Sequence, residues 1–463
     1  MNSSLVTPDN KWLFDKYNVR GSYYTSYPPA GLWLKDFSSN DYVDAFKESF
    51  SNRFAVPLQL YIHFPFCKMQ CWYCLCYQIV SNDQSNIGNM VKYLQKELDL
   101  LFELFVSNAI AVSFKEIHFG GGSPSYLETR EFDSLINKLQ SFINFKEVSE
   151  IAIEIDPRTI NKDNLKYYHE KGINRISFGV QDINPDVQKA INRIQPIELI
   201  EELLEMRELF KCVNFDLIYG LPLQTRESFK NTIDKVIELS PDRIDLGIMG
   251  YRPDVFKHNR LIEESDIPNL IEIKLMWEDS VMNLTSNGYE RIGMDHFAKK
   301  TDVLAVAKKN KALFRNPMGY SPGRFHDNIS IGPSGMTKIS NYYFQNTYSF
   351  SNYYSDIDKK KFPVFRGYKL SKDDLMRRDI INQIMTYYYL NYSDIEEKYD
   401  IDFNRYFDRE IDLLREFVRE GILEIFPDRI TVTPLGNFFL RNICAMFDNL
   451  GKEYRHNKET ASC

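Results

Sequence analysis

The hydrophobic periodicity of the chain switches repeatedly between strand-like and helix-like from about residue 57 to residue 295. Each strand-like run is followed by a helical stretch, and six or seven such pairs follow one another. Parallel strands need a crossover connection, which is usually a helix. The alternation therefore predicts an α/β fold with a parallel sheet that closes as a full or partial β/α barrel.

The individual elements are predicted from the same pattern. The expected strands cover residues 58–63, 116–119, 150–155, 175–180, 213–218, 243–248 and 290–294. The expected helices cover residues 90–105, 130–143, 162–171, 196–210, 227–239 and 271–286. Because functional residues of such barrels gather at the carboxyl ends of the strands, we expect the polar residues at successive strand ends to converge on one mouth.

The rest of the chain has a different pattern. We expect an N-terminal arm at residues 1–48, the barrel at 49–300, an irregular cover that completes the active site at 301–368, and a mainly helical, winged-helix-like domain at 369–463. Residues 310–355 are rich in Tyr, Asn and Ser without clear periodicity, which favours loop structure. The C-terminal region has no basic stripe, so we favour a packing role for it over DNA binding.

Composition excludes several classes of protein. The chain is 43% hydrophobic and 26% charged, which is typical of globular proteins. Its net charge of −7 provides no positive field to hold nucleic acid. No run approaches the ~20 apolar residues of a membrane span, and the N-terminus lacks a signal-peptide pattern. We therefore expect a cytoplasmic monomer with neither a nucleic-acid nor a membrane partner.

Four of the seven cysteines, Cys67, Cys71, Cys74 and Cys76, lie within ten residues. Thiolates so close on one loop suit soft metal ions or iron–sulfur clusters. Three of them can hold three irons of a cubane and leave the fourth iron open to substrate. The alternatives are a structural zinc site or unligated thiols. Zinc sites usually draw two cysteine pairs from separate knuckles, and no second CxxC pair occurs in this chain.

The segment YIHFPFCKMQCWYCLC, residues 61–76, resembles the signature of radical S-adenosylmethionine (SAM) enzymes. Its CxxxCxxCxC string is similar to that of the oxygen-independent coproporphyrinogen III oxidase family. Further motifs resemble that family in the same order: YTSYP (24–28), GGGSPSYL (120–127), EIDPR (154–158), FGVQD (178–182), NRIQ (192–195), DLIYGLP (216–222), GMDHFA (293–298) and RNIC (441–444). The resemblance covers nearly the whole chain.

The resemblance implies a partial (β/α)6-type radical SAM barrel and a specific set of cofactor contacts. Cys67, Cys71 and Cys74 would bind a 4Fe–4S cluster whose open iron SAM chelates, and Cys76 would not be a ligand. A first SAM would contact Tyr61, Gly121 and Glu154. A second would lie near Tyr73, Gly122, Ser123, Gln181, Arg193, Asp216, Gly250 and Met336.

Each of these residues also has an ordinary structural interpretation. A triple glycine is usually only a turn, although its place after the second strand favours a cofactor site. Glu154 and Asp216 are strand-end carboxylates, which are commonly solvated or capping. Arg193 could pair with a carboxylate, but an exposed helical arginine is the more common case.

The resemblance also implies a reaction. The reduced cluster would cleave SAM to a 5′-deoxyadenosyl radical, which attacks the β-carbon of a propionate on coproporphyrinogen III. Two propionates would become vinyl groups, giving protoporphyrinogen IX in anaerobic haem biosynthesis. An electron donor protein such as flavodoxin or ferredoxin would reduce the cluster. Arg20, Arg252 and Arg324 are the candidates for binding the carboxylates of this tetrapyrrole substrate.

Several positions depart from the family pattern. Tyr23 occupies a position where a basic residue is expected, and residues 249–253, 319–322 and 332–337 also differ. Two alternatives therefore stay open: a radical SAM enzyme with another substrate, such as a methyltransferase or an anaerobic haem-opening enzyme, and a non-catalytic haem or cluster carrier. The carrier is disfavoured because it has no need of a cofactor pocket.

Overall fold

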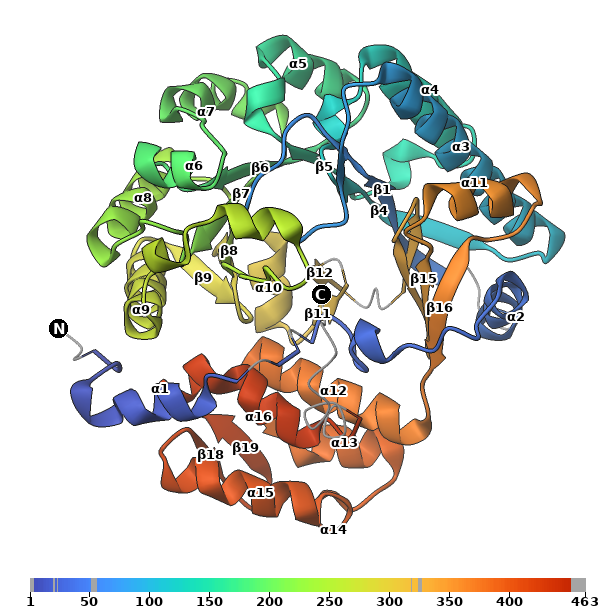
Figure 1. The fold of residues 1–463 in the computed structure, drawn as a ribbon. Coiled ribbons are helices and arrows are strands. Elements are labelled where there is room, and N and C mark those ends of the chain that lie inside the picture. Colours follow the sequence, from blue (N-terminus) through green and yellow to red (C-terminus); the bar gives the residue numbers. More distant parts are fainter. Residues whose placement is uncertain are drawn as a thin grey trace.

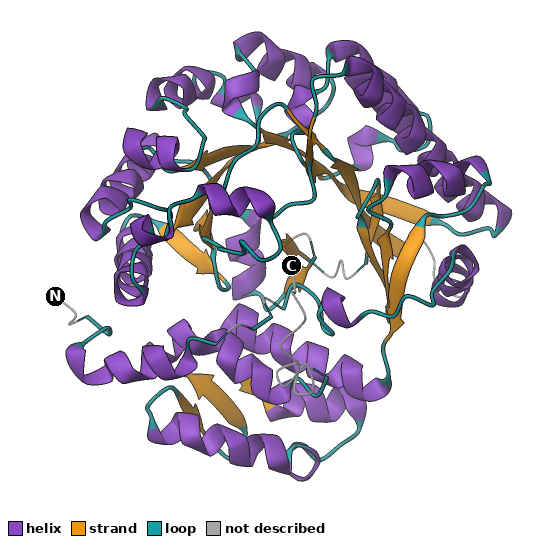
Figure 2. Ribbon diagram, in the orientation of Figure 1, coloured by secondary structure: helices purple, strands orange, loops and turns teal. Residues whose placement is uncertain are grey.

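A curved 12-stranded sheet dominates the computed structural model, which describes residues 4–19, 21–22, 24–50, 56–317, 319–323 and 327–450. The strand order is β16-β15-β14-β13-β1-β4-β5-β6-β7-β8-β10-β9. Figure 2 shows the strands as an inner ring with helices outside them. Within the described ranges, no helix has the length and apolar character that crossing a membrane requires.

Six consecutive parallel strands form the centre of the sheet. They are β1 (Val56–Phe64), β4 (Val112–Gly121), β5 (Glu150–Ile155), β6 (Arg175–Gln181), β7 (Cys212–Tyr219) and β8 (Arg243–Ile248). Each pairs in parallel with the next. The predicted parallel sheet and partial barrel are confirmed.

Helices cover the outer face of these strands (Figure 1). They are α3 (Gln84–Ser107), α4 (Thr129–Gln140), α5 (Lys162–Glu170), α6 (Pro185–Ala190), α7 (Ile197–Leu204), α8 (Arg226–Leu239) and α9 (Leu270–Ser286). In α4 the buried residues Phe132, Leu135, Ile136 and Leu139 recur at the helical spacing that forms one apolar face.

The two-residue period of β5 explains why the barrel interior is polar. Ile151, Ile153 and Ile155 are buried, and successive side chains of a strand point to opposite faces. The alternate residues Glu150 and Glu154 therefore lie on the other face. The same period places titratable side chains of the neighbouring strands inside the barrel.

The last expected strand does not add a seventh β/α repeat. β9 (Tyr289–Ile292) is separated from β8 by β10 (His296–Lys299), which pairs antiparallel with both. Only three residues connect β9 to β10, too few for a crossover helix, so the two strands form a hairpin. Gly293 supplies the positive φ of +81° that this turn uses.

The loop prediction for residues 310–355 is wrong. This stretch contains β11 (Leu313–Asn316), β12 (Gly319–Pro322), β13 (Asn328–Ile331), β14 (Met336–Ile339) and β15 (Tyr342–Asn346), between α10 (Val303–Lys309) and α11 (Phe350–Asp358). β13 pairs in parallel with β1, and β14, β15 and β16 (Val364–Lys369) continue the sheet antiparallel. These strands are short and β13 and β15 are buried throughout, so no apolar–polar alternation marks them.

The C-terminal region is mainly helical, as predicted, and lies across the open side of the sheet (Figure 1). Its helices are α12 (Lys372–Tyr387), α13 (Tyr392–Tyr399), α14 (Phe403–Tyr406), α15 (Asp408–Arg419) and α16 (Leu440–Phe447). A small sheet has the order β17 (Tyr389–Asn391), β19 (Arg429–Val432), β18 (Leu423–Ile425).

The N-terminal segment contributes to two cores. Leu13 and Phe14 of α1 (Lys11–Tyr17) are buried in the core of the C-terminal region. Tyr42 and Phe46 of α2 (Ser39–Phe50) are instead buried in the core of the barrel. The segment therefore joins both parts of the molecule.

Candidate functional site

The cysteine loop follows β1 at the carboxyl end of the parallel strands. Figure 1 shows it crossing the opening of the barrel. It begins at β2 (Phe66–Cys67), which pairs with β3 (Ile79–Val80). Cys71 is buried, Cys67 and Cys74 are half-buried, and Cys76 is exposed. The first strand thus delivers three thiols to the mouth where the polar strand ends converge.

Side chains from outside the loop hold its backbone in place. The Asn192 amide donates to the Gln70 carbonyl (2.8 Å), His258 Nε2 to the Cys74 carbonyl (2.6 Å), and the Asn259 amide to the Trp72 carbonyl (2.6 Å). These tethers bind carbonyl oxygens and leave the sulfur atoms for other partners.

Two buried guanidinium groups face the sulfur of Cys71. Arg158 Nη2 lies 3.5 Å and Arg193 Nη1 lies 3.4 Å from Cys71 Sγ. Arg158 also forms a two-pronged pair with Asp156, and Arg193 lies 3.6 Å from the same carboxylate. Burial raises the pKa of Asp156, but the two guanidinium groups outweigh it and hold that pKa below its usual value. Hydrogen-bond donors to a ligand atom orient and tune a metal centre.

This arrangement corrects the exposed-helix interpretation of Arg193 and adds two residues that sequence reasoning missed. Arg193 is only 6% exposed and follows α6 in a loop that contacts the cysteines. Asp156 and Arg158 belong to the EIDPR motif but had no assigned role. The signal that could have found them is a carboxylate and an arginine two residues apart, directly after a buried strand.

The three expected thiol ligands are not gathered around a single point. Among the residues that the structure describes, the group of three ligand atoms that all lie within 4.8 Å of one another is Asp245, Asp295 and His296. Ligands of one tetrahedral zinc, each at ~2.3 Å, stand about 3.8 Å apart. The thiols therefore do not form a ready-made site for one zinc ion.

Glu154 is the centre of the expected first SAM contact. Its Oε1 lies 2.8 Å from His118 Nε2, and its Oε2 accepts the Gly121 N–H at 3.2 Å. Burial raises the pKa of Glu154, but the bonds from His118 and Gly121 outweigh it and lower that pKa. Tyr61 lies next to His118 in the strand register. The structure thus brings Tyr61, Gly121 and Glu154 together.

The triple glycine is required by close packing of β4 against its neighbours β1 and β5. A Cβ on Gly120 would lie 2.5 Å from Glu154 Oε1, and one on Gly121 would lie 2.6 Å from the His63 ring. Gly121 also has a φ of +111°, which side-chain-bearing residues rarely adopt. These contacts make the glycines more than a turn, because a methyl group would fill the cradle beside Glu154.

Groups expected to contact a second SAM carry unused hydrogen-bonding capacity. Gln181 Oε1 and Arg193 Nε are buried without a hydrogen-bond partner in the described part of the chain. Asp216 accepts hydrogen bonds from Ser177 (3.1 Å) and Asn214 (2.7 Å). Burial, together with neighbouring carboxylates, raises the pKa of Asp216 to about 7. Unsatisfied buried polar atoms at a strand-end mouth fit a polar ligand.

The other expected contacts are spread around the same mouth. Tyr73 is in the cysteine loop, and Gly250 follows β8 directly against Leu75 of that loop. Ser123 is buried after the triple glycine, with its hydroxyl 3.1 Å from that of Ser125. Met336 begins β14, two strands from Tyr61, a placement that depends on the sheet extension that the sequence did not predict.

Only one of the three expected substrate arginines, Arg252, lies among the residues that the structure describes. It forms a two-pronged pair with Asp254, with both distances at 3.0 Å, and its role toward the substrate stays a prediction. Arg20, Arg324 and the departure at Tyr23 lie outside the described residues.

Family models match both parts of the chain. Residues 61–236 match the Radical SAM superfamily, and residues 370–439 match the HemN C-terminal domain. The barrel and its three-thiol loop therefore define a radical SAM protein.

Named relatives identify the branch. The oxygen-independent coproporphyrinogen III oxidase of Escherichia coli (strain K12) is 37% identical over 438 residues, 94% of each chain. That of Helicobacter pylori (strain ATCC 700392 / 26695) is 36% identical over 94% of this chain and 95% of its own. A solved structure of coproporphyrinogen III oxidase (HemN) from Escherichia coli, described as a radical SAM enzyme, matches with a TM-score of 0.86 and 36% identity over 92% of this chain and 97% of that one. The chain belongs to the oxygen-independent coproporphyrinogen III oxidase family, whose radical SAM membership implies a 4Fe–4S cluster and SAM.

Proposed function

We propose that this protein converts coproporphyrinogen III to protoporphyrinogen IX by oxidative decarboxylation of two propionate side chains in anaerobic haem biosynthesis. The observation that carries the proposal is the three-thiol loop that follows β1, at the same end of the sheet as the hydrogen-bonded pair Gly121 and Glu154. The similarity of relatives with this named activity over 94% of the chain supports it.

Cys67, Cys71 and Cys74 would hold the 4Fe–4S cluster, with Arg158 and Arg193 donating to the Cys71 sulfur. With SAM bound, this group would supply a 5′-deoxyadenosyl radical as the acceptor of one hydrogen atom from the substrate. Each propionate would become a vinyl group by losing that hydrogen atom, carbon dioxide, and one electron to a one-electron acceptor. Cys76, which is exposed, would not be a ligand of the cluster.

The chain's own groups bind and orient the first SAM. Glu154 is kept ionised by His118 and by the Gly121 N–H, so it can accept hydrogen bonds from a cationic amino group. The glycine cradle lets the backbone approach that ligand closely. Tyr61 of β1 lies opposite His118, the hydrogen-bond partner of Glu154. Such fixed contacts hold the reacting atoms in place, which is the main contribution a protein makes to radical chemistry.

A second SAM belongs to the same proposal. Tyr73, Gly122, Ser123, Gln181, Arg193, Asp216, Gly250 and Met336 would contact it. The buried, unpaired Gln181 Oε1 and Arg193 Nε support this assignment because unmet polar atoms are costly without a ligand.

A reducing partner completes the proposal. We infer an electron donor protein such as flavodoxin or ferredoxin, which would approach the mouth where the cysteine loop lies. We further infer that the protein acts as a cytoplasmic monomer.

Anaerobic turnover tests the function. The reconstituted, reduced protein is incubated with SAM and coproporphyrinogen III, and products are followed by mass spectrometry. We expect stepwise loss of two carboxyl groups with formation of 5′-deoxyadenosine. Methyl transfer or haem opening would instead support another radical SAM activity. Absence of 5′-deoxyadenosine would leave only the alternative of a non-catalytic haem or cluster carrier.

A further inference from the structure

A large cavity lies between the barrel and the C-terminal region, away from the cysteine loop. We call it the lower chamber; its volume is about 550 Å³. Cavities of 300–1,000 Å³ are the usual size of organic ligand sites. β11, β14, β15, α12, α13 and residues 24–27 contribute to its wall.

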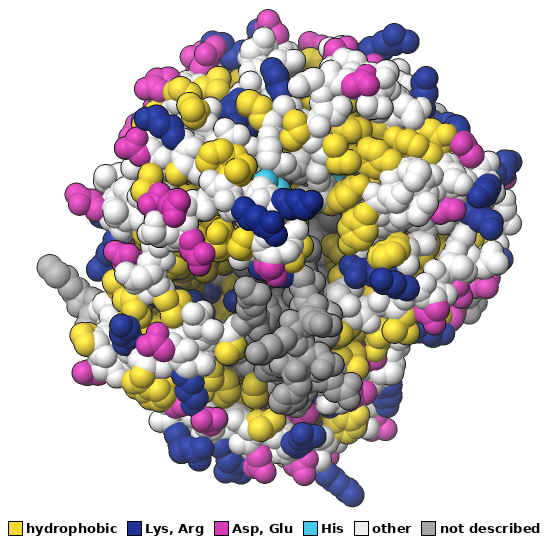
Figure 3. Space-filling model, in the orientation of Figure 1, with side chains coloured by type: hydrophobic (Ala, Val, Ile, Leu, Met, Phe, Trp, Pro, Cys, Tyr) yellow, Lys and Arg dark blue, Asp and Glu magenta, His cyan; other side chains and the backbone are white. Residues whose placement is uncertain are grey.

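The wall of the lower chamber is cationic and aromatic. It contains five cationic side chains, Lys311, Arg315, Lys338, Arg378 and Lys398, and only two carboxylates. Asp327 also pairs with Lys338, at 2.9 Å, yet the positive charges remain in excess. By contrast, Figure 3 shows basic and acidic side chains interspersed over the visible outer face of this chain of net charge −7. With several tyrosines also in the wall, the chamber suits an anion that has a large apolar body.

Arg378 on α12 is a buried cation of the wall with unused hydrogen-bonding capacity. Its contacts to Asp379 Oδ1 are long, at 3.3 Å, and the other oxygen of that carboxylate accepts shorter bonds from Lys398 (2.6 Å) and Tyr399 (2.7 Å). Arg378 Nη1 is buried and has no hydrogen-bond partner among the described residues. A carboxylate is the acceptor that best fits a guanidinium group.

The strand register places the chamber directly below the proposed cofactor level. Lys338 lies in the same row across the sheet as Gln59, whereas Met336 lies in the row of Tyr61. Same-face residues are two apart along a strand, which is about 6.7 Å. Asn316 lines both the lower chamber and the small interior cavity that includes Tyr61. A ligand in the chamber therefore lies next to the barrel interior.

We propose that the lower chamber binds the tetracarboxylate tetrapyrrole, with Arg378 and Lys338 holding carboxylates that are not reacting while the reacting propionate extends into the barrel. This inference rests on the proposed function. It adds to the candidates Arg20, Arg252 and Arg324 a surface shared by β14 and the C-terminal region. Arg378 is here a specificity-determining residue and takes no part in radical formation.

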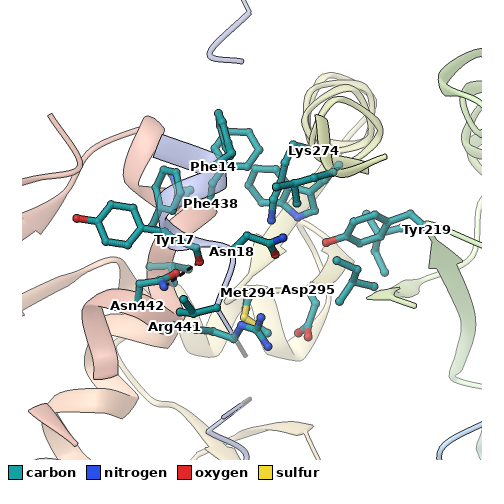
Figure 4. Close-up of a pocket in the computed structure, with 18 residues that line it drawn as sticks. Phe14, Tyr17, Asn18, Tyr219, Lys274, Met294, Asp295, Phe438, Arg441 and Asn442 are labelled. Atoms are coloured by element: carbon teal, nitrogen blue, oxygen red, sulfur yellow. Dashed lines mark hydrogen bonds between the residues drawn. The ribbon is translucent and has the colours of Figure 1, made fainter. Parts of the chain in front are cut away.

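The control comes from a neighbouring small cavity of about 100 Å³, into which Lys274 of α9 and Arg441 of α16 extend (Figure 4). Lys274 does not line the lower chamber. Burial, with Arg441 nearby, lowers the pKa of Lys274 to about 8. Lys274→Gln thus removes a half-buried lysine that lies outside the proposed site.

Binding to the anaerobic holoenzyme is measured by fluorescence titration with coproporphyrin III, a stable tetracarboxylate, and with its uncharged tetramethyl ester. We expect Arg378→Gln to weaken binding of coproporphyrin III about tenfold or more, the effect of one hydrogen bond to a charged group. The affinity of Arg378→Lys should lie between those of wild type and Arg378→Gln, since lysine keeps the charge without the planar guanidinium group. Lys274→Gln should bind like wild type, and the ester should not distinguish the variants.

Asn382→Asp is the second variant, because Asn382 is a half-buried residue of the chamber wall and a carboxylate there should repel the ligand. If the folded Arg378→Gln and Asn382→Asp variants bind coproporphyrin III as wild type does, the lower chamber is not the substrate site. Normal turnover by the wild-type protein would then leave the proposed function intact. If binding depends on Arg378 but the wild-type protein does not turn over coproporphyrinogen III, the proposed function is wrong and the binding site stands. SAM cleavage without substrate should be equal in all variants.

Discussion

At the scale of single residues, the sequence indicates which groups reach the mouth but not what surrounds them. Cys71 and Gly121 follow predicted strands, Glu154 lies near the end of another, and adjacent parallel strands must bring their ends together. The burial of Arg193 against Cys71 depends instead on a contact between two loops that are 122 residues apart. No local pattern encodes such a contact.

The glycine cradle gives a residue-scale prediction. Gly121→Ala should lower SAM affinity and the free energy of unfolding by about 1 kcal/mol or more, because the new Cβ meets the His63 ring and φ is +111°. The control is Gly88→Ala within α3, where the nearest atom is 3.8 Å away and alanine should stabilise the helix by up to ~1 kcal/mol. Isothermal titration calorimetry measures SAM affinity, and urea unfolding measures the free energy of unfolding. Equal values of both quantities in the two variants would contradict a role of Gly121 in binding SAM.

At the scale of elements, periodicity predicts long, repeated segments well and short ones poorly. The six central strands and their helices have several residues of clear period two or 3.6, and they are where the sequence places them. β13 and β15 have four and five residues, and all of them are buried. Because polar residues are buried on both faces, no alternation of apolar and polar residues marks these strands. Their position is fixed by tertiary contacts such as those of Glu97.

Glu97 gives an element-scale prediction on pH. This buried carboxylate of α3 accepts hydrogen bonds from Gly332 N–H (2.7 Å), Asn346 Nδ2 (2.7 Å) and Tyr353 OH (2.6 Å), joining α3 to the sheet extension. Burial outweighs these bonds and raises its pKa to about 7. A carboxyl whose folded pKa is raised contributes stability that is complete below pH ~4.5 and is lost as pH rises through ~7.

The stability of wild type relative to Glu97→Gln should therefore fall by about 2–3 kcal/mol between pH 5 and pH 8. The control is Glu103→Gln, an exposed position on the same helix, for which the difference should stay constant. Urea unfolding across this pH range measures both. A pH-independent difference for Glu97→Gln would show that the carboxyl does not titrate as proposed.

At the scale of the whole molecule, the N-terminal segment is part of the C-terminal core rather than only an arm. Phe14 is 1% exposed and its ring lies 5.3 Å from that of Phe438 and 5.2 Å from that of Phe439. Contacts between residues more than 400 positions apart do not affect local periodicity, so the sequence could not predict this packing. They join the segment to the region that forms one wall of the lower chamber.

Phe14→Ala should consequently destabilise the protein by about 3–5 kcal/mol through the cavity that it leaves. Trp12→Ala, at a position 52% exposed on the same helix, should cost no more than about 0.5 kcal/mol. Chemical unfolding followed by circular dichroism measures both. A small effect of Phe14→Ala would mean that this helix is not an integral part of the core.

The central claim is that three thiols on one loop leave an iron open for SAM. Its most direct test is the electron paramagnetic resonance spectrum of the reduced, reconstituted protein with and without SAM. We predict iron and sulfide in the proportion of a 4Fe–4S cluster, a spectrum that changes when SAM binds, loss of the signal in Cys71→Ala, and its retention in Cys76→Ala. Bound zinc, absence of sulfide, or a spectrum that SAM leaves unchanged would contradict the claim.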